Sequence, residues 1–289
     1  MSQFAFVLIN EAKTSPLAAQ ITPDVLGKMA AAITIQLNRD FAPHWGGSYM
    51  VRVGSGPTDL IKGEVAFAIL DALPDAPGAI AYHDVDGNAI PVAFLSLSTC
   101  NTLADVSMAI SHECIETGTD PGCNLWADDG AGTEWAYEGC DAVESSSYQI
   151  DEIVVSDFVL PQFFVKNGQG PYSFMNTAPA PFTCGAGGYQ IKRVSGTGES
   201  QVTGDLSSKR GLKVASGAHH WSSRPARRGV KIQWLRHVFV VPPPMGVSGE
   251  THFETVQDAF SYASSRHLEV SVRVFINDSL IGQYVVLRP

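Results

Sequence analysis

Apolar positions in the first half of the chain fall into short runs and helical repeats that alternate. The run Phe4–Ile9 predicts a buried strand. Thr22 is a typical helix N-cap and Pro23 suits the first helical position, so the apolar repeat that follows predicts a helix ending near Asp40. Two short strands are then expected, at 49–53 and 65–70.

The centre of the chain predicts a hairpin followed by a helix. Two apolar runs, 79–83 and 90–98, are joined by Asp, Gly and Asn residues that favour a tight turn. Thr102 and Asp105 have the spacing of a capping box, so a helix should open there and stop at Gly118. The pattern next predicts a short helix at 134–143, a strand at 150–158 and an ordered loop at 160–188.

The amino-acid composition changes near residue 195, where Ser, Gly and Thr become frequent. A helix is expected at 250–265, and alternating apolar residues from Val270 to Ile276 predict a half-buried strand before a last strand at 280–287. We therefore expect an α+β chain of two domains. Residues 1–195 would form the first domain, and residues 196–289 a mostly β accessory domain.

The predicted central helix carries the motif His-Glu-x-x-Glu at His112, Glu113 and Glu116. Residues four apart on a helix share a face, so His112 and Glu116 are expected to hold one metal ion with Glu113 beside them. The motif resembles the zincin pattern His-Glu-x-x-His, in which two histidines bind zinc and the glutamate is the general base. The alternative is a helix whose acidic side chains are merely solvated.

Glu138 and Asp141 follow some 25 residues downstream on the predicted short helix. In the gluzincin type of zincin, a glutamate on a following helix is the third ligand and a nearby aspartate bonds a ligand histidine. This resemblance implies that Glu138 binds the metal and Asp141 orients His112 from behind, or that the two exchange roles.

Four segments are similar to a family of largely uncharacterised bacterial and phage proteins that carry His-Glu-x-x-Glu in a zincin-like setting. The similarity spans about residues 20–165 and implies a metallopeptidase-like α+β fold, with a mixed sheet and an active-site helix, but no established substrate. The segments are Ala79–Asp84, Ile110–Glu116 with Asp120-Pro121, Glu138–Asp141 and Val155–Pro161.

Four further side chains are candidates for the same site. His83, in the predicted hairpin, is either a hydrogen-bond donor to a transition state or an exposed turn histidine. Asp120 is either a ligand, by analogy with zincins that use a downstream aspartate, or the cap of a turn before Pro121. Tyr137 and Tyr148 are candidate donors to an oxyanion, and the sequence does not select between them.

The ligand set predicts which metal the site would take. One imidazole nitrogen and two carboxylates suit zinc first, and manganese or calcium also accept them. Two carboxylates cancel the charge of a divalent ion and weaken its acidification of bound water. The five cysteines contain no Cys-x-x-Cys pair, which argues against a zinc knuckle or a disulfide framework. We expect free, buried thiols, with one near the motif as a candidate soft ligand.

Charge is distributed very unevenly. Between Lys62 and Lys166 there is no Lys or Arg but there are 18 Asp and Glu, a distribution that favours a metal centre over a nucleic-acid site. The segment Lys209–Arg236 carries eight basic residues and no acid. It suits either nucleic acid or an acidic protein surface, and we expect it to dock on the first domain or on a partner subunit.

Together these patterns predict a metal-dependent hydrolase, a peptidase or amidase acting on a peptide or protein. The alternative is a non-catalytic structural or interaction protein, for example a phage virion component, that retains the scaffold. No apolar run is long enough to cross a membrane, and the N-terminus lacks a basic leader. We therefore expect a cytoplasmic or virion-associated protein, with a homo-oligomer or larger assembly formed through the C-terminal domain.

Overall fold

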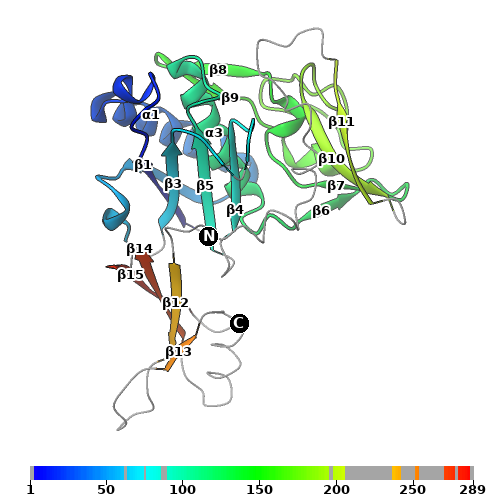
Figure 1. Cartoon of the computed structure of the whole chain (residues 1–289). Coiled ribbons are helices and arrows are strands. Elements are labelled where there is room, and N and C mark those ends of the chain that lie inside the picture. Colours follow the sequence, from blue (N-terminus) through cyan, green and yellow to red (C-terminus); the bar gives the residue numbers. More distant parts are fainter. Residues whose placement is uncertain are drawn as a thin grey trace.

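The computed structural model describes residues 3–61, 64–74, 76–85, 90–194 and 198–205, and the backbone of four strands farther along the chain. The fold is α+β, as predicted: helices pack on a mixed five-stranded sheet, and further antiparallel sheets follow (Figure 1). None of the described helices combines the length and apolar character needed to cross a bilayer.

The five-stranded sheet has the order β2-β1-β3-β5-β4. Its first four strands run parallel, whereas β4 pairs antiparallel with β5 at one edge and completes the predicted hairpin. Burial on both faces of the inner strands β1, β3 and β5 explains their unbroken apolar runs, whereas β2, at the other edge, alternates buried and exposed residues. The strands are β1 (Gln3–Asn10), β2 (Ser48–Val53), β3 (Glu64–Leu70), β4 (Ala81–Val85) and β5 (Pro91–Ser96).

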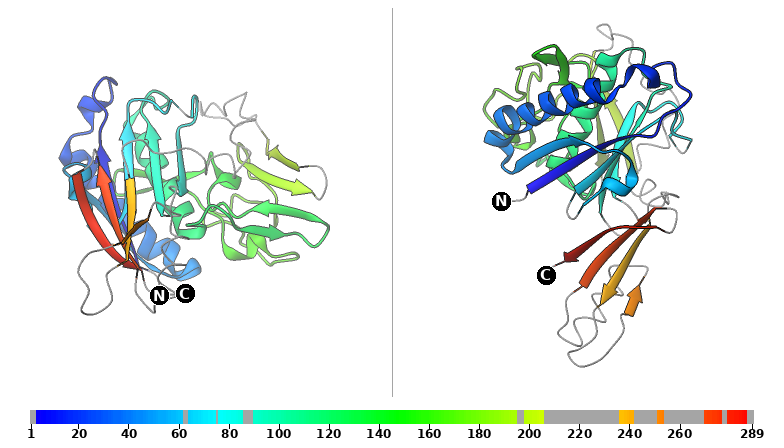
Figure 2. Two further views of the ribbon diagram at one scale, coloured as in Figure 1. Left: turned by 60° about the horizontal axis from the view of Figure 1, so that its bottom comes forward. Right: turned by 90° about the vertical axis from the view of Figure 1, so that its left-hand side faces the viewer.

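Two helices, α1 (Pro23–Ile35) and α3 (Leu103–Thr119), share one hydrophobic core with the sheet (Figure 2). Phe6 and Leu8 of β1 enter this core. Both helices begin where the sequence predicts. The Thr22 hydroxyl accepts from the N–H of Val25, and a complete capping box with Asp105 opens α3.

The first helix does not end as a regular α-helix. It passes into a π-helical segment, Gln36–Phe41, and then into α2 (Ala42–Trp45). Gln36, at the start of the wide turn, is fully buried; it accepts a hydrogen bond from Ser111 of α3 and donates to the carbonyl of Ser156. A π turn thus places an amide where it ties the central helix to its neighbours.

Helix α3 continues to Thr119, one residue beyond the predicted stop at Gly118. The glycine serves packing instead, because a Cβ there would lie 3.0 Å from the ring of Phe41. Thr119 donates its hydroxyl to the carbonyl of Ile115 and extends the last turn.

The predicted helix at 134–143 is wrong. The first residues of that segment form a strand, β7, in a four-stranded antiparallel sheet of order β11-β10-β7-β6. Only its last residues are helical, in a 3₁₀ turn, η4 (Asp141–Val143). Glu134 faces Arg193 across the sheet at 2.6 Å, and this pairing partner is too distant in sequence for a local pattern to reveal. The strands are β6 (Trp126–Asp128), β7 (Thr133–Ala136), β10 (Tyr189–Val194) and β11 (Gly198–Thr203).

The predicted strand at 150–158 is instead part of a hairpin of β8 (Ser147–Ile150) and β9 (Ile153–Ser156). Asp151 turns the chain there with a φ of 53°, a conformation that Asp tolerates better than most residues. The predicted loop follows, with a 3₁₀ turn η5 (Pro161–Phe164) whose Phe164 ring packs edge-on against Trp45.

The C-terminal part contains a further antiparallel sheet of order β13-β12-β14-β15 (yellow to red in Figure 1). Its last two strands confirm the predicted ones, whereas β13 replaces the start of the helix expected at 250–265. Strand β11 pairs with β10 across residue 195, and the proposed domain division stays a prediction. The basic segment 209–235 lies outside the described residues. The strands are β12 (Arg236–Val241), β13 (Thr251–Phe253), β14 (Val270–Ile276) and β15 (Ser279–Val286).

Candidate metal centre

Two histidines and five carboxylates from separate parts of the fold converge at the C-terminal half of α3. The helix supplies the predicted motif, β4 supplies one histidine, and the segment around η4 supplies three acids. We call this group the His–carboxylate cluster. Its members are His83, His112, Glu113, Glu116, Glu138, Asp141 and Glu144.

His112 contacts three carboxylates. Its Nε2 lies 3.3 Å from Oε1 of Glu116, one turn away on the same helix, and 3.4 Å from Oδ1 of Asp141. Its other ring nitrogen, Nδ1, lies 3.3 Å from Oε2 of Glu144. A histidine whose two nitrogens both face carboxylates is typical of metal ligands, since one nitrogen binds and the other is held from behind.

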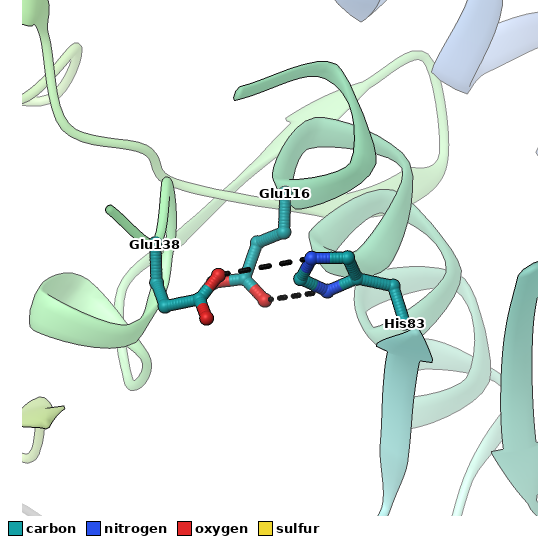
Figure 3. Close-up of side chains that lie close together, drawn as sticks. All are labelled: His83, Glu116 and Glu138. Carbon is teal, nitrogen blue, oxygen red and sulfur yellow. Dashed lines mark ion pairs between the residues drawn. The ribbon is translucent and has the colours of Figure 1, made fainter. Parts of the chain in front are cut away.

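His83 approaches the same helix from β4, the antiparallel edge strand. Its Nδ1 lies 3.3 Å from Oε2 of Glu113. The same Nδ1 lies 3.4 Å from Oε2 of Glu116, and its Nε2 lies 3.8 Å from Oε2 of Glu138 (Figure 3). The carboxylate of Glu116 therefore lies between the two histidines.

These contacts are longer than ordinary charged hydrogen bonds. Arg52–Glu64 and Arg193–Glu134 in the same structure close to 2.6 Å, whereas every histidine–carboxylate pair of the cluster stands at 3.3 Å or more. Around a tetrahedral zinc ion with bonds of about 2.0–2.1 Å, neighbouring ligand atoms are about 3.3–3.4 Å apart. The spacing suits donor atoms arranged around a cation better than atoms bonded to one another.

The acids outside α3 are held in place by close backbone packing. Gly139, between two of them, leaves so little room that a Cβ would lie 2.6 Å from Oγ1 of Thr119. The next N–H, that of Cys140, donates to Oε1 of Glu116. In a 3₁₀ turn residues three apart eclipse, so Asp141 and Glu144 come to the same side.

Burial and charge oppose each other in the cluster. Burial lowers the pKa of His112, but the negative charges of Glu116 and Glu144 outweigh it and raise that pKa well above its ordinary value. Burial also raises the pKa of Glu116, yet His112 and His83 lower it by more. Burial and the charge of Glu116 together raise the pKa of Asp141. The cluster is thus a strongly negative, buried environment that attracts positive charge.

The structure brings most of the predicted site residues together but in a different grouping. Glu138 adjoins His83, while Asp141 adjoins Nε2 of His112, which favours the exchanged roles that the sequence left open. His83 is only 2% exposed, so it is not an exposed turn histidine. Asp120 is buried in its turn and accepts the N–H of Leu125.

The described contacts of both predicted tyrosines lie away from the cluster. Tyr148 donates to Asp40, and Tyr137 packs on Trp45 and a phenylalanine of η5. Tyr189 of β10 adjoins the cluster instead: its phenol hydrogen-bonds Asp141, and burial followed by the negative charge of Asp141 raises its pKa.

Sequence reasoning missed Tyr189 and Glu144. The tyrosine lies more than 40 residues after the last acid of the cluster, and no local pattern singles it out. Glu144, however, continues the spacing of three set by Glu138 and Asp141, and this signal was available.

All five cysteines are free. Two of them approach the histidines: the thiol of Cys123 lies 3.8 Å from the carbonyl of His83, and that of Cys140 lies 3.8 Å from the carbonyl of His112. Burial raises the pKa of Cys140 well above its ordinary value, so this thiol stays protonated and packs as an apolar group.

No protein-family model, curated protein or solved structure matches the chain at a significant level. The geometry of the site alone therefore indicates its chemistry. Its buried His, Glu and Asp side chains could hold a metal ion.

Proposed function

We propose that the chain is a zincin-like, metal-dependent hydrolase that cleaves peptide or amide bonds. One observation carries this proposal: Nε2 of His112 on α3 lies 3.3 Å from Oε1 of Glu116 and 3.4 Å from Oδ1 of Asp141, the spacing of ligands around one cation, and Glu113 is adjacent. The mixed sheet with an antiparallel edge strand beside the helix supports a zincin-like scaffold.

In this proposal Nε2 of His112, Glu116 and Asp141 bind the metal. Glu144 holds the second nitrogen of His112 and fixes the ring, the usual arrangement behind a ligand histidine. The proposal exchanges Glu138 and Asp141 relative to the first interpretation of the sequence. One nitrogen and two carboxylates make zinc the first expectation, with manganese or calcium as alternatives.

Glu113 acts as the general base. Its carboxylate lies within 4.8 Å of donor atoms of both His112 and Glu116, and Nδ1 of His83 contacts it at 3.3 Å. A base in this position takes a proton from a water molecule and returns it to the leaving amine. Tyr189, whose raised pKa keeps its phenol protonated, donates to the developing oxyanion.

Glu113→Gln tests this assignment. The amide keeps the size of the side chain but cannot accept the proton, so metal content should be unchanged while turnover of a peptide library falls by about 10²-fold or more. Exposed Glu152 provides the matched control, and Glu152→Gln should change neither quantity. Full activity in Glu113→Gln would contradict the role of this residue.

A non-catalytic role is the second candidate, and the depth of the cluster favours it. His83, Glu116 and Glu138 are each at most 5% exposed, as in structural metal sites that substrate does not reach. A protein of this kind, such as a virion component, would lose thermal stability in chelator and hydrolyse no peptide. An unchanged melting temperature in chelator excludes a structural metal.

We also propose that the C-terminal β-rich part serves attachment or assembly, through a homo-oligomer or a larger particle. Its antiparallel strands β12–β15 form a sheet of their own, which supports an accessory role. Analytical ultracentrifugation of the full chain and of a chain ending after residue 205 tests this. If both sediment with the same number of chains per particle, the C-terminal part does not drive assembly.

A further inference from the structure

We propose that the His–carboxylate cluster holds two divalent cations that share the carboxylate of Glu116 as a bridge. This inference rests on the proposed function, because one of the two positions is the metal of that site. The outer position comprises His112 with Glu116 and Asp141, whose oxygens lie 3.3 and 3.4 Å from its Nε2. The inner position comprises His83, Glu116 and Glu138 (Figure 3).

The two oxygens of Glu116 face different histidines. Oε1 lies 3.3 Å from Nε2 of His112. Oε2 faces the His83 ring, and Glu116 shares with His83 and Glu138 a set of donor atoms that all lie within 4.8 Å of one another. A carboxylate that offers one oxygen to each of two donor groups is placed to bridge two ions. In two-metal sites the ions lie about 3.5–4 Å apart, a separation that one carboxylate spans.

The inner position contains a buried polar atom without a hydrogen bond. Nε2 of His83 has no hydrogen-bond partner within the described part of the chain, although the residue is only 2% exposed. It points at Oε2 of Glu138 across 3.8 Å, too far for a hydrogen bond. Buried polar atoms are nearly always paired, so an unpaired nitrogen beside two carboxylates suits a bound cation, with the Cys123 thiol also next to the imidazole. His83, Glu116 and Glu138 each offer a donor atom, all within 4.8 Å of one another.

The charge of the cluster also calls for more than one cation. Its five carboxylates are opposed by two imidazoles, and no Lys or Arg occurs between Lys62 and Lys166. With neutral imidazoles, a single divalent ion offsets only two of the five negative charges, whereas two ions offset four. Uncompensated buried charge is costly, so the second ion stabilises the cluster.

A second ion also compensates for the glutamate, Glu116, that stands where the zincin motif has its second histidine. Replacing a ligand histidine by Glu116 puts an extra negative charge on the outer metal and weakens its effect on bound water. A cation on the other oxygen of Glu116 withdraws that charge. The outer position is also the more accessible, because the side chains of His112 and Glu144 are 11% and 17% exposed, against 2% for His83. We therefore assign substrate to the outer ion and charge compensation to the inner one.

The test is metal stoichiometry of the full-length chain. Apo protein is loaded separately with Zn²⁺ and Mn²⁺, freed of unbound metal and measured by elemental mass spectrometry. We expect about two ions per chain in the natural protein and about one in His83→Ala, with the outer ion retained. The exposed His44 gives the matched control, since His44→Ala removes an imidazole away from the cluster and should keep both ions.

Electron paramagnetic resonance of the Mn²⁺-loaded natural protein provides a second measurement that needs no variant. Two ions bridged by one carboxylate should give a spin-coupled spectrum rather than that of isolated Mn²⁺. One ion per chain with an uncoupled spectrum, unchanged in His83→Ala, would overturn the two-metal inference and leave the single-metal hydrolase intact. Absence of bound metal in the natural protein would overturn both.

Discussion

Gly139 determines how closely the segment that carries Glu138 approaches α3. A Cβ at this position would lie 2.6 Å from Oγ1 of Thr119 and 3.0 Å from Cγ2 of Ile115, both side chains on the helix. Gly139→Ala should therefore push the segment away, destabilise the fold by about 1–3 kcal/mol and weaken metal binding. Urea denaturation and metal titration measure the two effects.

Gly27, in α1, is the control for this substitution. Nothing lies within 4 Å of a Cβ built there, so Gly27→Ala should stabilise the protein by up to about 1 kcal/mol through helix propensity alone. If both alanine variants are equally tolerated, the close approach of Gly139 to the helix does not constrain the cluster.

Asp71 makes a pH-dependent contact between the ends of β3 and β1. The backbone N–H groups of Lys13, Ser15 and Thr14 donate to its carboxylate and lower its pKa from 3.8 to about 2. A lowered pKa stabilises the fold above pH 3.8, and that contribution is lost as the pH falls through about 2. Asp71→Asn should therefore lower the melting temperature at pH 7.

Titration of the Asp71 carboxyl carbon by NMR measures this pKa directly. A midpoint near 3.8 would show that the three N–H groups do not hold the carboxylate. Thermal melts of Asp71→Asn should approach those of the natural protein only at the acid end of the range.

At the scale of an element, α3 is positioned by a buried polar network around Ser111. The Ser111 hydroxyl donates to Oε1 of Gln36 at 2.7 Å and accepts the N–H of Ser156 at 2.9 Å. Ser111→Ala leaves both partners buried and unpaired, so we expect a loss of about 2–4 kcal/mol. Because His112 is the next residue, metal affinity should fall as well. Chemical denaturation and metal titration measure these changes.

Ser147, exposed on β8, is the control for Ser111. Ser147→Ala should change stability by no more than about 0.5 kcal/mol. In a double-mutant cycle, Gln36→Leu and Ser111→Ala should be non-additive, since they remove the same hydrogen bond. Additive losses would mean that the network does not couple the two helices.

Elements with local signals could be predicted from the sequence, and those with remote partners could not. The cap residues Thr22 and Thr102 act within one turn, and both helix starts are confirmed. Strand β7 pairs with β6 across a short turn and with β10 nearly 60 residues later, and the second pairing has no local signal. The π turn at Gln36 is likewise set by contacts with α3 and β9.

The same distinction applies to the cluster. His112, Glu113 and Glu116 were predictable because helical spacing alone puts them side by side. His83 joins them only because β4 lies next to α3 in the folded chain, and a hairpin pattern cannot show which element its edge will face.

At the scale of the whole molecule, the acidic central segment brings carboxylates close enough to repel one another, and a bound cation would reduce that repulsion. The described ion pairs of Arg and Lys lie outside the His–carboxylate cluster, on Asp40, Glu64 and Glu134 among others. Folding brings the five cluster carboxylates together although they are dispersed over residues 113–144 in sequence. We therefore expect the free energy of unfolding to depend on bound metal more strongly than it would for an ion held by a single surface loop.

Removal of metal tests this dependence. Because metal binds the folded cluster and not the dispersed unfolded ligands, saturation at 100 times the dissociation constant should stabilise the fold by about 2.7 kcal/mol. Chelator should then lower the melting temperature, and Zn²⁺ or Mn²⁺ should restore it in proportion to the logarithm of its concentration. Glu116→Gln, which removes the charge that both positions share, should melt at one temperature with or without chelator. If chelator leaves the melting temperature of the natural protein unchanged, the fold accommodates the carboxylates without a metal, and the proposed metal centre is wrong.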